Sequence, residues 1–245
     1  MRTVALALAA ALLAACSPAE ATRTVTVFAA ASLTETFEQL AKKFEAQHDG
    51  VDVRLSFGGS SRLAEQIVEG APAEVFAAAD EKAMAKVTAA RLADGKPRVF
   101  ARNRLTIAVP PGNPMGLKGL ADLRKDDLTV VMCAAEVPCG RAARALTTAA
   151  QVQLEPASEE PDVKSVLGKV ATGEADAGLV YVTDVRAADD KVDGVPIAGA
   201  DAAANSYPIV MLREAAENKL ARQFVQFVLS DEGQRVLRDA GFDAP

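Results

Sequence analysis

Tryptophan is absent from this sequence, and aromatic residues make up only 4% of it. Ligands that proteins bind by stacking, such as sugars, flavins and single-stranded nucleic acid, are therefore poorly supported. The net charge of −6 argues further against nucleic acid, because no basic stripe is available to displace counterions. The single histidine, His48, leaves a zinc or copper site short of ligands. We therefore expect no cofactor, no metal bound directly by protein ligands and no nucleic-acid partner.

Signals for catalysis are equally scarce. His48 stands in the polar segment 47–50, which favours a surface position, so a serine or cysteine nucleophile would lack a base. No G-x-S-x-G nucleophile elbow is present. We expect that the chain is not an enzyme, and an exported hydrolase is kept as an alternative.

The N-terminus has the features of a targeting segment. Arg2 precedes an apolar stretch at residues 4–13, which is too short to remain in a membrane as a spanning helix. The following L-A-A-C ends at Cys16 and resembles the bacterial lipobox, in which the cysteine is lipidated and becomes the first residue. We expect a signal peptide at 1–15 and a lipidated N-terminus with a spacer at 16–23. An ordinary signal peptide with a chance cysteine is the alternative.

Three cysteines are an odd number for an exported chain. Lipidation of Cys16 would leave Cys133 and Cys139, separated by a short loop. A disulfide between them is plausible outside the cytoplasm, and closing so small a loop contributes roughly 2 kcal/mol in the chain-entropy model. A metal pair or a reactive thiol is the competing interpretation.

Half of the 245 residues are hydrophobic, and from residue 24 onward strands and helices alternate. Strand patterns occur at 24–29, 51–57 and 74–79, with helical spacing at 33–45 and 63–68 between them. This rhythm predicts a parallel sheet covered by helices. Further strands are expected at 104–110, 128–133, 177–182, 195–198 and 207–212, with helices near 142–150, 163–172 and the C-terminus.

Two successive α/β blocks, followed by a C-terminal segment that returns to the first block, predict a two-lobed clamshell. We place lobe 1 at residues 24–103 plus 208–245, and lobe 2 at residues 104–207. The chain would then cross between the lobes near Asn103 and Tyr207.

Three strand-to-helix turns share small residues that would let a backbone approach a ligand. They lie at residues 29–34, 57–61 and 137–141. Helix N-termini bind anions well, because their N–H groups are unpaired and the helix dipole is positive there. Each turn also has an ordinary explanation: Ser32 with Glu35 forms an S-x-x-E capping box, and Asp162 is a typical N-cap. Repetition of such turns at one edge of parallel sheets favours a ligand site.

A set of motifs runs in order along the chain. They are V-F-A-A-A-S-L (27–33), S-F-G-G-S-S (56–61), G-A-P-A-E-V-F-A-A-A-D (70–80), V-P-C-G (137–140), D-V-K (162–164), A-G-L-V-Y (177–181) and Y-P-I (207–209). In combination they resemble the molybdate-binding components of bacterial ABC importers, over about Thr24 to Phe242. The resemblance implies the α/β, type II periplasmic-binding-protein fold, with a mostly parallel sheet in each lobe and the ligand in the interlobe cleft.

The resemblance also implies which residues bind the ligand. The implied groups are the hydroxyls and amides of Ser32 and Ser60, the backbone amides of Cys139 and Val163, and the phenol of Tyr181. Ser61 is a reserve candidate for the role of Ser60. The sequence departs from many members at Cys139, where they have a small residue and no partner at Cys133, but a backbone amide tolerates that change.

Two arginines stand beside these predicted site residues. Arg62 and Arg141 each fall in the first turn of an expected helix, and we expect both to be solvated.

All five nominated groups can donate hydrogen bonds, which suits a fully deprotonated dianion. Phosphate near neutrality keeps a proton that needs an acceptor, and leaving it unpaired would cost about 1–3 kcal/mol. The resemblance implies molybdate or tungstate as ligand and the membrane permease of an ABC importer as partner. We expect a monomer, anchored by lipid on the extracytoplasmic face. The same fold binding sulfate or another tetrahedral oxyanion is the alternative.

Overall fold

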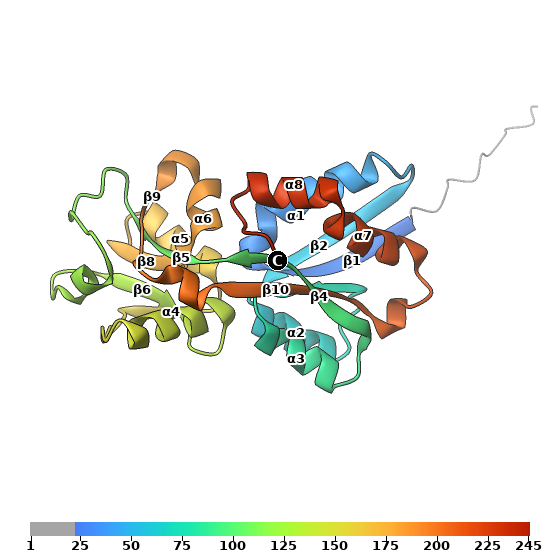
Figure 1. Ribbon diagram of the computed structural model, residues 1–245, viewed down its shortest axis with the longest axis horizontal. Coiled ribbons are helices and arrows are strands. Elements are labelled where there is room, and N and C mark those ends of the chain that lie inside the picture. The colour runs from blue at the N-terminus through green and yellow to red at the C-terminus, as the bar shows by residue number, and fades with distance from the viewer. Residues whose placement is uncertain (1–22) are drawn as a thin grey trace, which may run out of the picture.

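The structure is a computed structural model that describes residues 23–245 as two lobes, each built around its own five-stranded sheet (Figure 1). The predicted signal peptide at 1–15 and Cys16 lie outside the described residues. Within 23–245, no helix is both long and apolar enough to cross a membrane.

The first lobe contains the N-terminal sheet. Its strands, in spatial order, are β2 (Val51–Gly58), β1 (Arg23–Ala30), β3 (Val75–Ala77), β10 (Asn205–Leu212) and β4 (Ala93–Asn103). Strand β1 is parallel to both β2 and β3, whereas β10 is antiparallel to β3 and β4. In Figure 1 one face is covered by α1 (Thr34–Glu45), α7 (Lys219–Leu229) and α8 (Asp231–Asp239), and the other by α2 (Ser60–Val68) and α3 (Glu81–Ala89).

The second lobe repeats this plan with fewer residues. Its strands, in spatial order, are β7 (Ser158–Glu160), β6 (Val130–Cys133), β8 (Ala177–Tyr181), β5 (Leu105–Val109) and β9 (Asp193–Val195). Strand β6 is parallel to β7 and β8, and β5 is antiparallel to β8 and β9. Its helices are α4 (Pro138–Ala149), α5 (Val163–Ala171) and α6 (Val182–Ala187).

Short 3₁₀ turns connect several of these elements. They are η1 (Ala31–Leu33), η2 (Leu120–Arg124), η3 (Asp189–Lys191), η4 (Ala200–Ala203) and η5 (Arg213–Ala215). The turn η1 separates the end of β1 from the start of α1.

The predicted two-lobed α/β architecture is confirmed, but each sheet is mixed rather than mostly parallel. The chain leaves the first sheet at the end of β4 and enters the second at β5, then returns through β10. These connecting strands supply the antiparallel pairings. Strand β4 was not expected, because Gly95 and Pro97 are typical of turns. The strand can contain a proline because it lies at an edge of its sheet.

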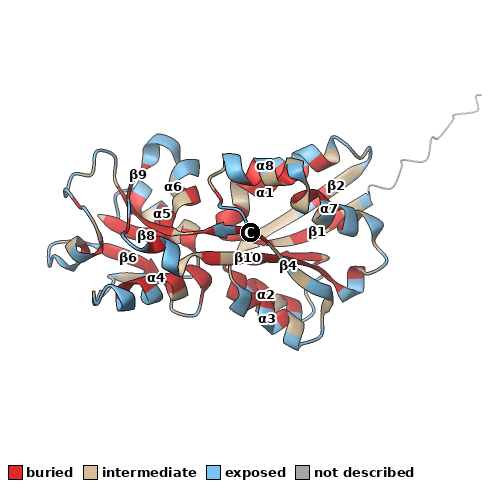
Figure 2. Cartoon of the chain, in the orientation of Figure 1, coloured by how far each residue is buried: buried red, intermediate tan, exposed pale blue. Residues whose placement is uncertain are grey.

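Helix α1 shows how the hydrophobic pattern builds the core. Its residues Phe37, Leu40 and Phe44 recur at helical spacing and are fully buried. The rings of Phe37 and Phe44 meet Phe224 of α7 at centroid distances of 6.3 and 5.3 Å, both edge to face. This packing fastens the C-terminal helices to the first lobe. Figure 2 shows the buried strands within each lobe and the exposed outer faces of the helices.

Candidate ligand-binding site

A small cavity lies where the two lobes meet. It contains about 220 Å³ of empty space, part of which is open to solvent. The volume inside it that a water-sized molecule could occupy is only about 10 Å³, so this cavity suits a small ion rather than a drug-sized ligand. Its wall is formed by Ala30, Ala31, Ser32, Gly58, Gly59, Ser60, Ala79, Val137, Pro138, Cys139, Asp162, Val163 and Tyr181.

The first lobe contributes two buried serines to this wall. Ser32 lies in η1 after β1, and Ser60 is the first residue of α2 after β2. The Oγ of Ser60 accepts a hydrogen bond from the Ala79 N–H at 3.0 Å. The Oγ of Ser32 lies 2.9 Å from the phenolic oxygen of Tyr207. Both serines thus sit at helical starts and already have one fixed polar neighbour.

The ordinary capping explanation for Ser32 is wrong. Helix α1 begins at Thr34, because η1 intervenes, and no side chain caps its N-terminus. Glu35, the other half of the expected capping box, instead binds Lys164 of the second lobe. The expected N-cap at Asp162 is confirmed, since its carboxylate accepts from the Ser165 N–H at 3.0 Å.

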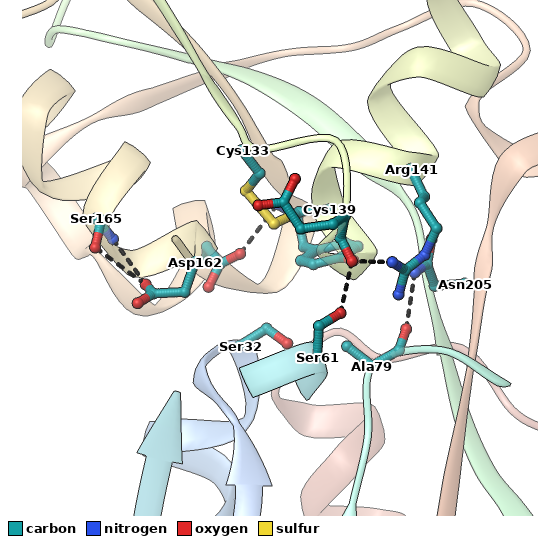
Figure 3. The surroundings of a disulfide bond; sticks show 12 residues. Ser32, Ser61, Ala79, Cys133, Cys139, Arg141, Asp162, Ser165 and Asn205 are labelled. Carbon is teal, nitrogen blue, oxygen red and sulfur yellow. Dashed lines mark hydrogen bonds between the residues drawn. A yellow bond between two sulfur atoms is a disulfide. The ribbon is translucent and has the colours of Figure 1, made fainter. Parts of the chain in front are cut away.

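The second lobe presents the starts of two helices to the cavity. Cys139 is the second residue of α4, and Val163 is the first residue of α5. N–H groups in a first helical turn have no partner within the helix, and the helix dipole makes this end positive. Asp162 also reaches the wall, but its carboxylate binds the N–H and hydroxyl of Ser165, as Figure 3 shows. Both helix starts are therefore suited to an anion.

Tyr181 completes the wall of the cavity. It is the last residue of β8 and only 1% exposed, and its phenolic oxygen has no hydrogen-bond partner among residues 23–245. Burial raises the pKa of Tyr181 well above its ordinary value, so the phenol keeps its proton. A buried hydroxyl without a partner is costly, so this phenol has a proton available for a hydrogen bond in the cavity.

A disulfide fastens one edge of the cavity. Cys133, at the end of β6, is bonded to Cys139 in α4, with their Cα atoms 5.7 Å apart (Figure 3). The neighbouring Gly140 has no room for a side chain, because a Cβ there would lie 1.9 Å from the carbonyl oxygen of Ala134. The start of α4 is thereby held close to the end of β6. Among the described residues, no cluster of three or more histidine, cysteine or acidic side chains could hold a metal ion.

Ion pairs join the two lobes around the cavity. Arg141 of α4 binds Asp80 ahead of α3, with Nε 2.6 Å from Oδ2. Lys164 of α5 binds both carboxylate oxygens of Glu35 in α1 at 2.8 Å. The expectation that Arg141 is solvated is therefore wrong in the main, because the side chain pairs with Asp80 and is only 21% exposed. Arg62 is exposed, as expected.

Contacts with backbone carbonyl oxygens also join the lobes. The hydroxyl of Ser61 donates to the carbonyl oxygen of Glu136 at 2.6 Å, and Ser61 is not part of the cavity wall. A Cβ on Gly59 would lie 2.4 Å from the carbonyl oxygen of Pro161. The described structure is therefore a closed arrangement, in which the lobes are in contact beside the cavity.

Comparison with known proteins identifies the family of this chain. Residues 25–243 match the model of the bacterial extracellular solute-binding protein family. The chain belongs to this family. Its members are solute-binding proteins rather than enzymes.

Among relatives of this solute-binding protein, the molybdate-binding protein ModA of Mycobacterium tuberculosis is 44% identical over 228 residues, covering 93% of this chain and 87% of the relative. The structure of the Azotobacter vinelandii periplasmic molybdate-binding protein matches 90% of this chain and 99% of its own, with 25% identity and a TM-score of 0.76. The sulfate-binding protein SubI of M. tuberculosis has a TM-score of 0.77 with 17% identity, covering 91% and 87%, and shows the fold alone.

The solute-binding protein brings Ser32, Ser60, Cys139, Val163 and Tyr181 together at one cavity. Sequence reasoning missed the polar partners behind this wall. The hydroxyl of Tyr207 and the N–H of Ala79 lie on different strands or loops from the serines they contact. Tyr207 could have been noticed as one of only two tyrosines in the chain, placed just before the apolar run 208–212.

Proposed function

We propose that this protein captures molybdate outside the cytoplasm and delivers it to the membrane permease of an ABC importer. The observation that carries the proposal is a small cavity between the closed lobes whose nominated groups can all donate hydrogen bonds. The resemblance to molybdate-binding relatives along nearly the whole chain supports the choice of ligand.

In this proposal five groups hold the anion. The hydroxyls of Ser32 and Ser60 and the phenol of Tyr181 would donate through side chains, and Cys139 and Val163 through backbone N–H groups. A fully deprotonated tetrahedral dianion has only acceptors, so every contact is satisfied. Hydrogen phosphate carries one proton, and none of the five nominated groups is a carboxylate that would accept it. Asp162 also reaches the wall, with its Oδ1 bound to the N–H and hydroxyl of Ser165. Binding without charged ligands is feasible, since several dipoles act together in a closed site of low dielectric constant.

We further propose that ligand binding favours the closed state. Residues 24–103 plus 208–245 would form one lobe and residues 104–207 the other, with the anion bridging them. A ligand held by both lobes binds the closed form better than the open form and shifts the population toward it. The pairs Arg141–Asp80 and Lys164–Glu35 would then form on closure.

The proposal includes export and anchoring. A signal peptide at 1–15 would direct the chain out of the cytoplasm, and lipidation of Cys16 would hold it at the membrane surface. Several acyl chains anchor a protein stably where a single one does not. The binding protein would act as a monomer, and tungstate would bind in the same way as molybdate.

Isothermal titration calorimetry on the soluble domain, beginning after Cys16, tests the function. We expect one-to-one binding of molybdate and tungstate, much weaker binding of sulfate and none of phosphate. Sulfate binding as tight as molybdate would keep the site but change the ligand. Folded protein that binds none of the four anions would reject the proposed function.

A further inference from the structure

Tyr207 lies behind the cavity wall rather than in it. It belongs to β10, one of the two connections between the lobes, and is fully buried. Its ring packs edge to face against Phe100, Tyr181 and Phe242, at centroid distances of 6.3, 5.9 and 5.5 Å. Its hydroxyl reaches the Oγ of Ser32 at 2.9 Å. The tyrosine is thus rigidly held, and its polar end touches a nominated ligand-binding group.

The direction of this hydrogen bond decides what Ser32 offers to the cavity. A hydroxyl has one proton to donate and lone pairs to accept. If Tyr207 donates, the proton of Ser32 is free for the ligand. If Ser32 donates to Tyr207, Ser32 turns only lone pairs toward the cavity and repels an anion. Burial raises the pKa of Tyr207 above its ordinary value, although the hydrogen bond with Ser32 opposes the shift, so the phenol keeps its proton in either arrangement.

Ser60 shows the same arrangement without ambiguity. Its Oγ accepts from the backbone N–H of Ala79 at 3.0 Å, and an N–H can only donate. The proton of Ser60 is therefore free for the cavity. A Tyr207 hydroxyl that donates would stand in the same relation to Ser32 as the Ala79 N–H does to Ser60. Each serine would then have a fixed donor on the acceptor side of its hydroxyl.

We propose that Tyr207 is a positioning residue that donates to Ser32 and so makes the site accept only fully deprotonated anions. This inference rests on the proposed function. Without the phenolic hydroxyl, Ser32 can rotate and accept the proton of hydrogen phosphate. Tyr207 would then contribute to selectivity as well as to affinity, although it does not touch the ligand.

A double-mutant cycle tests this role. Tyr207→Phe keeps the ring and removes the hydroxyl, and we expect molybdate to bind about tenfold more weakly. In a Ser32→Ala background the same change should alter the affinity less than about twofold, because its target is gone. Millimolar phosphate should compete with molybdate in Tyr207→Phe but not in the wild type. The matched control is Phe242→Leu, which disturbs the same aromatic cluster without removing a hydroxyl.

The outcomes of these experiments distinguish a failure of the role of Tyr207 from a failure of the proposed function. Wild-type protein that fails to bind molybdate rejects the proposed ligand, and the cycle is then run with tungstate or sulfate, whichever binds. If none of these anions binds, the inference is rejected with the function. If wild type binds but Tyr207→Phe binds equally well, only the role of Tyr207 is rejected. An equal loss with and without Ser32 would show a merely structural effect and also overturn the role. Should Tyr207→Phe fail to fold, Tyr207→Leu removes the same hydroxyl, and Phe242→Leu remains its control.

Discussion

The two walls of the cavity present similar chemistry from different parts of the chain. The wall from the first lobe uses the hydroxyls of Ser32 and Ser60, whereas the second lobe presents the first-turn amides at Cys139 and Val163, with the phenol of Tyr181 beside them. Side-chain donors depend on residue identity. Backbone donors depend on where a helix begins, and every residue except proline supplies one. The two serines and Tyr181 should therefore be sensitive to substitution, and the two helix starts of the second wall to backbone geometry.

Closure should be the most sensitive property, because it brings the two walls together. A Cβ at Gly59 would lie 2.4 Å from the carbonyl oxygen of Pro161 in the opposite lobe. We expect Gly59→Ala to weaken ligand binding about hundredfold, since the closed state is overpacked while the open state has room. Calorimetry measures the affinity, and thermal unfolding of the ligand-free protein should change little.

Gly58→Ala is the matched control for Gly59→Ala. A Cβ on Gly58 meets only the side chain of Leu63, at 3.5 Å, which is an ordinary contact. If Gly59→Ala binds as tightly as Gly58→Ala, the two lobes do not need the closed arrangement to hold the ligand.

The hydroxyl donors of the first wall should come next. Ser60→Ala removes a hydrogen bond to a charged ligand, and we expect about 10- to 100-fold weaker binding. Ser61→Ala provides the comparison, because the Ser61 hydroxyl binds the carbonyl oxygen of Glu136 instead of lining the cavity. Its effect should stay within about fivefold. A larger loss for Ser61→Ala than for Ser60→Ala in calorimetry would reverse the assignment of the two serines.

The second wall should tolerate a change of side chain at a donor. We expect Cys133→Ala with Cys139→Ala to leave the ligand affinity within about threefold, because the substitution at Cys139 keeps the backbone N–H. The free energy of unfolding should fall by about 2 kcal/mol through loss of the short disulfide loop. Urea denaturation measures the stability. A loss of affinity as large as that of Ser60→Ala would show that the disulfide itself positions the donor.

The smallest effect on ligand affinity is expected for Asp184→Asn, because Asp184 contacts the backbone of Tyr181 and does not line the cavity. Its carboxylate accepts from the Tyr181 N–H at 3.0 Å, and burial raises the pKa of Asp184 to about 6, although Lys164 opposes the shift. The folded state then binds more protons than the unfolded state between about pH 4 and pH 6. The free energy of unfolding of the wild type should therefore fall relative to Asp184→Asn as pH rises through that window. A constant difference between the two proteins, measured by denaturation across pH, would contradict the shift.

Much of the fold could be predicted from the sequence. Alternating and helical hydrophobic patterns predicted most strands and helices, because Phe37, Leu40 and Phe44 must face a core wherever α1 packs. Strand β4 escaped prediction, since its Gly95 and Pro97 are typical of turns and only pairing with β10 makes it a strand.

The nominated site residues came from motifs, but the contacts behind them could not be predicted. Composition and periodicity alone indicated helix starts with small residues that favour a ligand site, but not which ligand binds there. The bond between Ser32 and Tyr207 joins residues 175 positions apart, and the pair of Arg141 with Asp80 joins opposite lobes. Such contacts depend on tertiary packing, so a local pattern carries no sign of them.

A crystal structure with bound molybdate would test the central claim most directly. We predict that the anion lies in the cavity, with its oxygens within hydrogen-bond distance of the hydroxyls of Ser32, Ser60 and Tyr181 and of the N–H groups of Cys139 and Val163. We also predict that no carboxylate contacts the anion. An anion bound elsewhere, or held in the cavity by Asp162 or a charged side chain instead of these five donors, would contradict the proposed site.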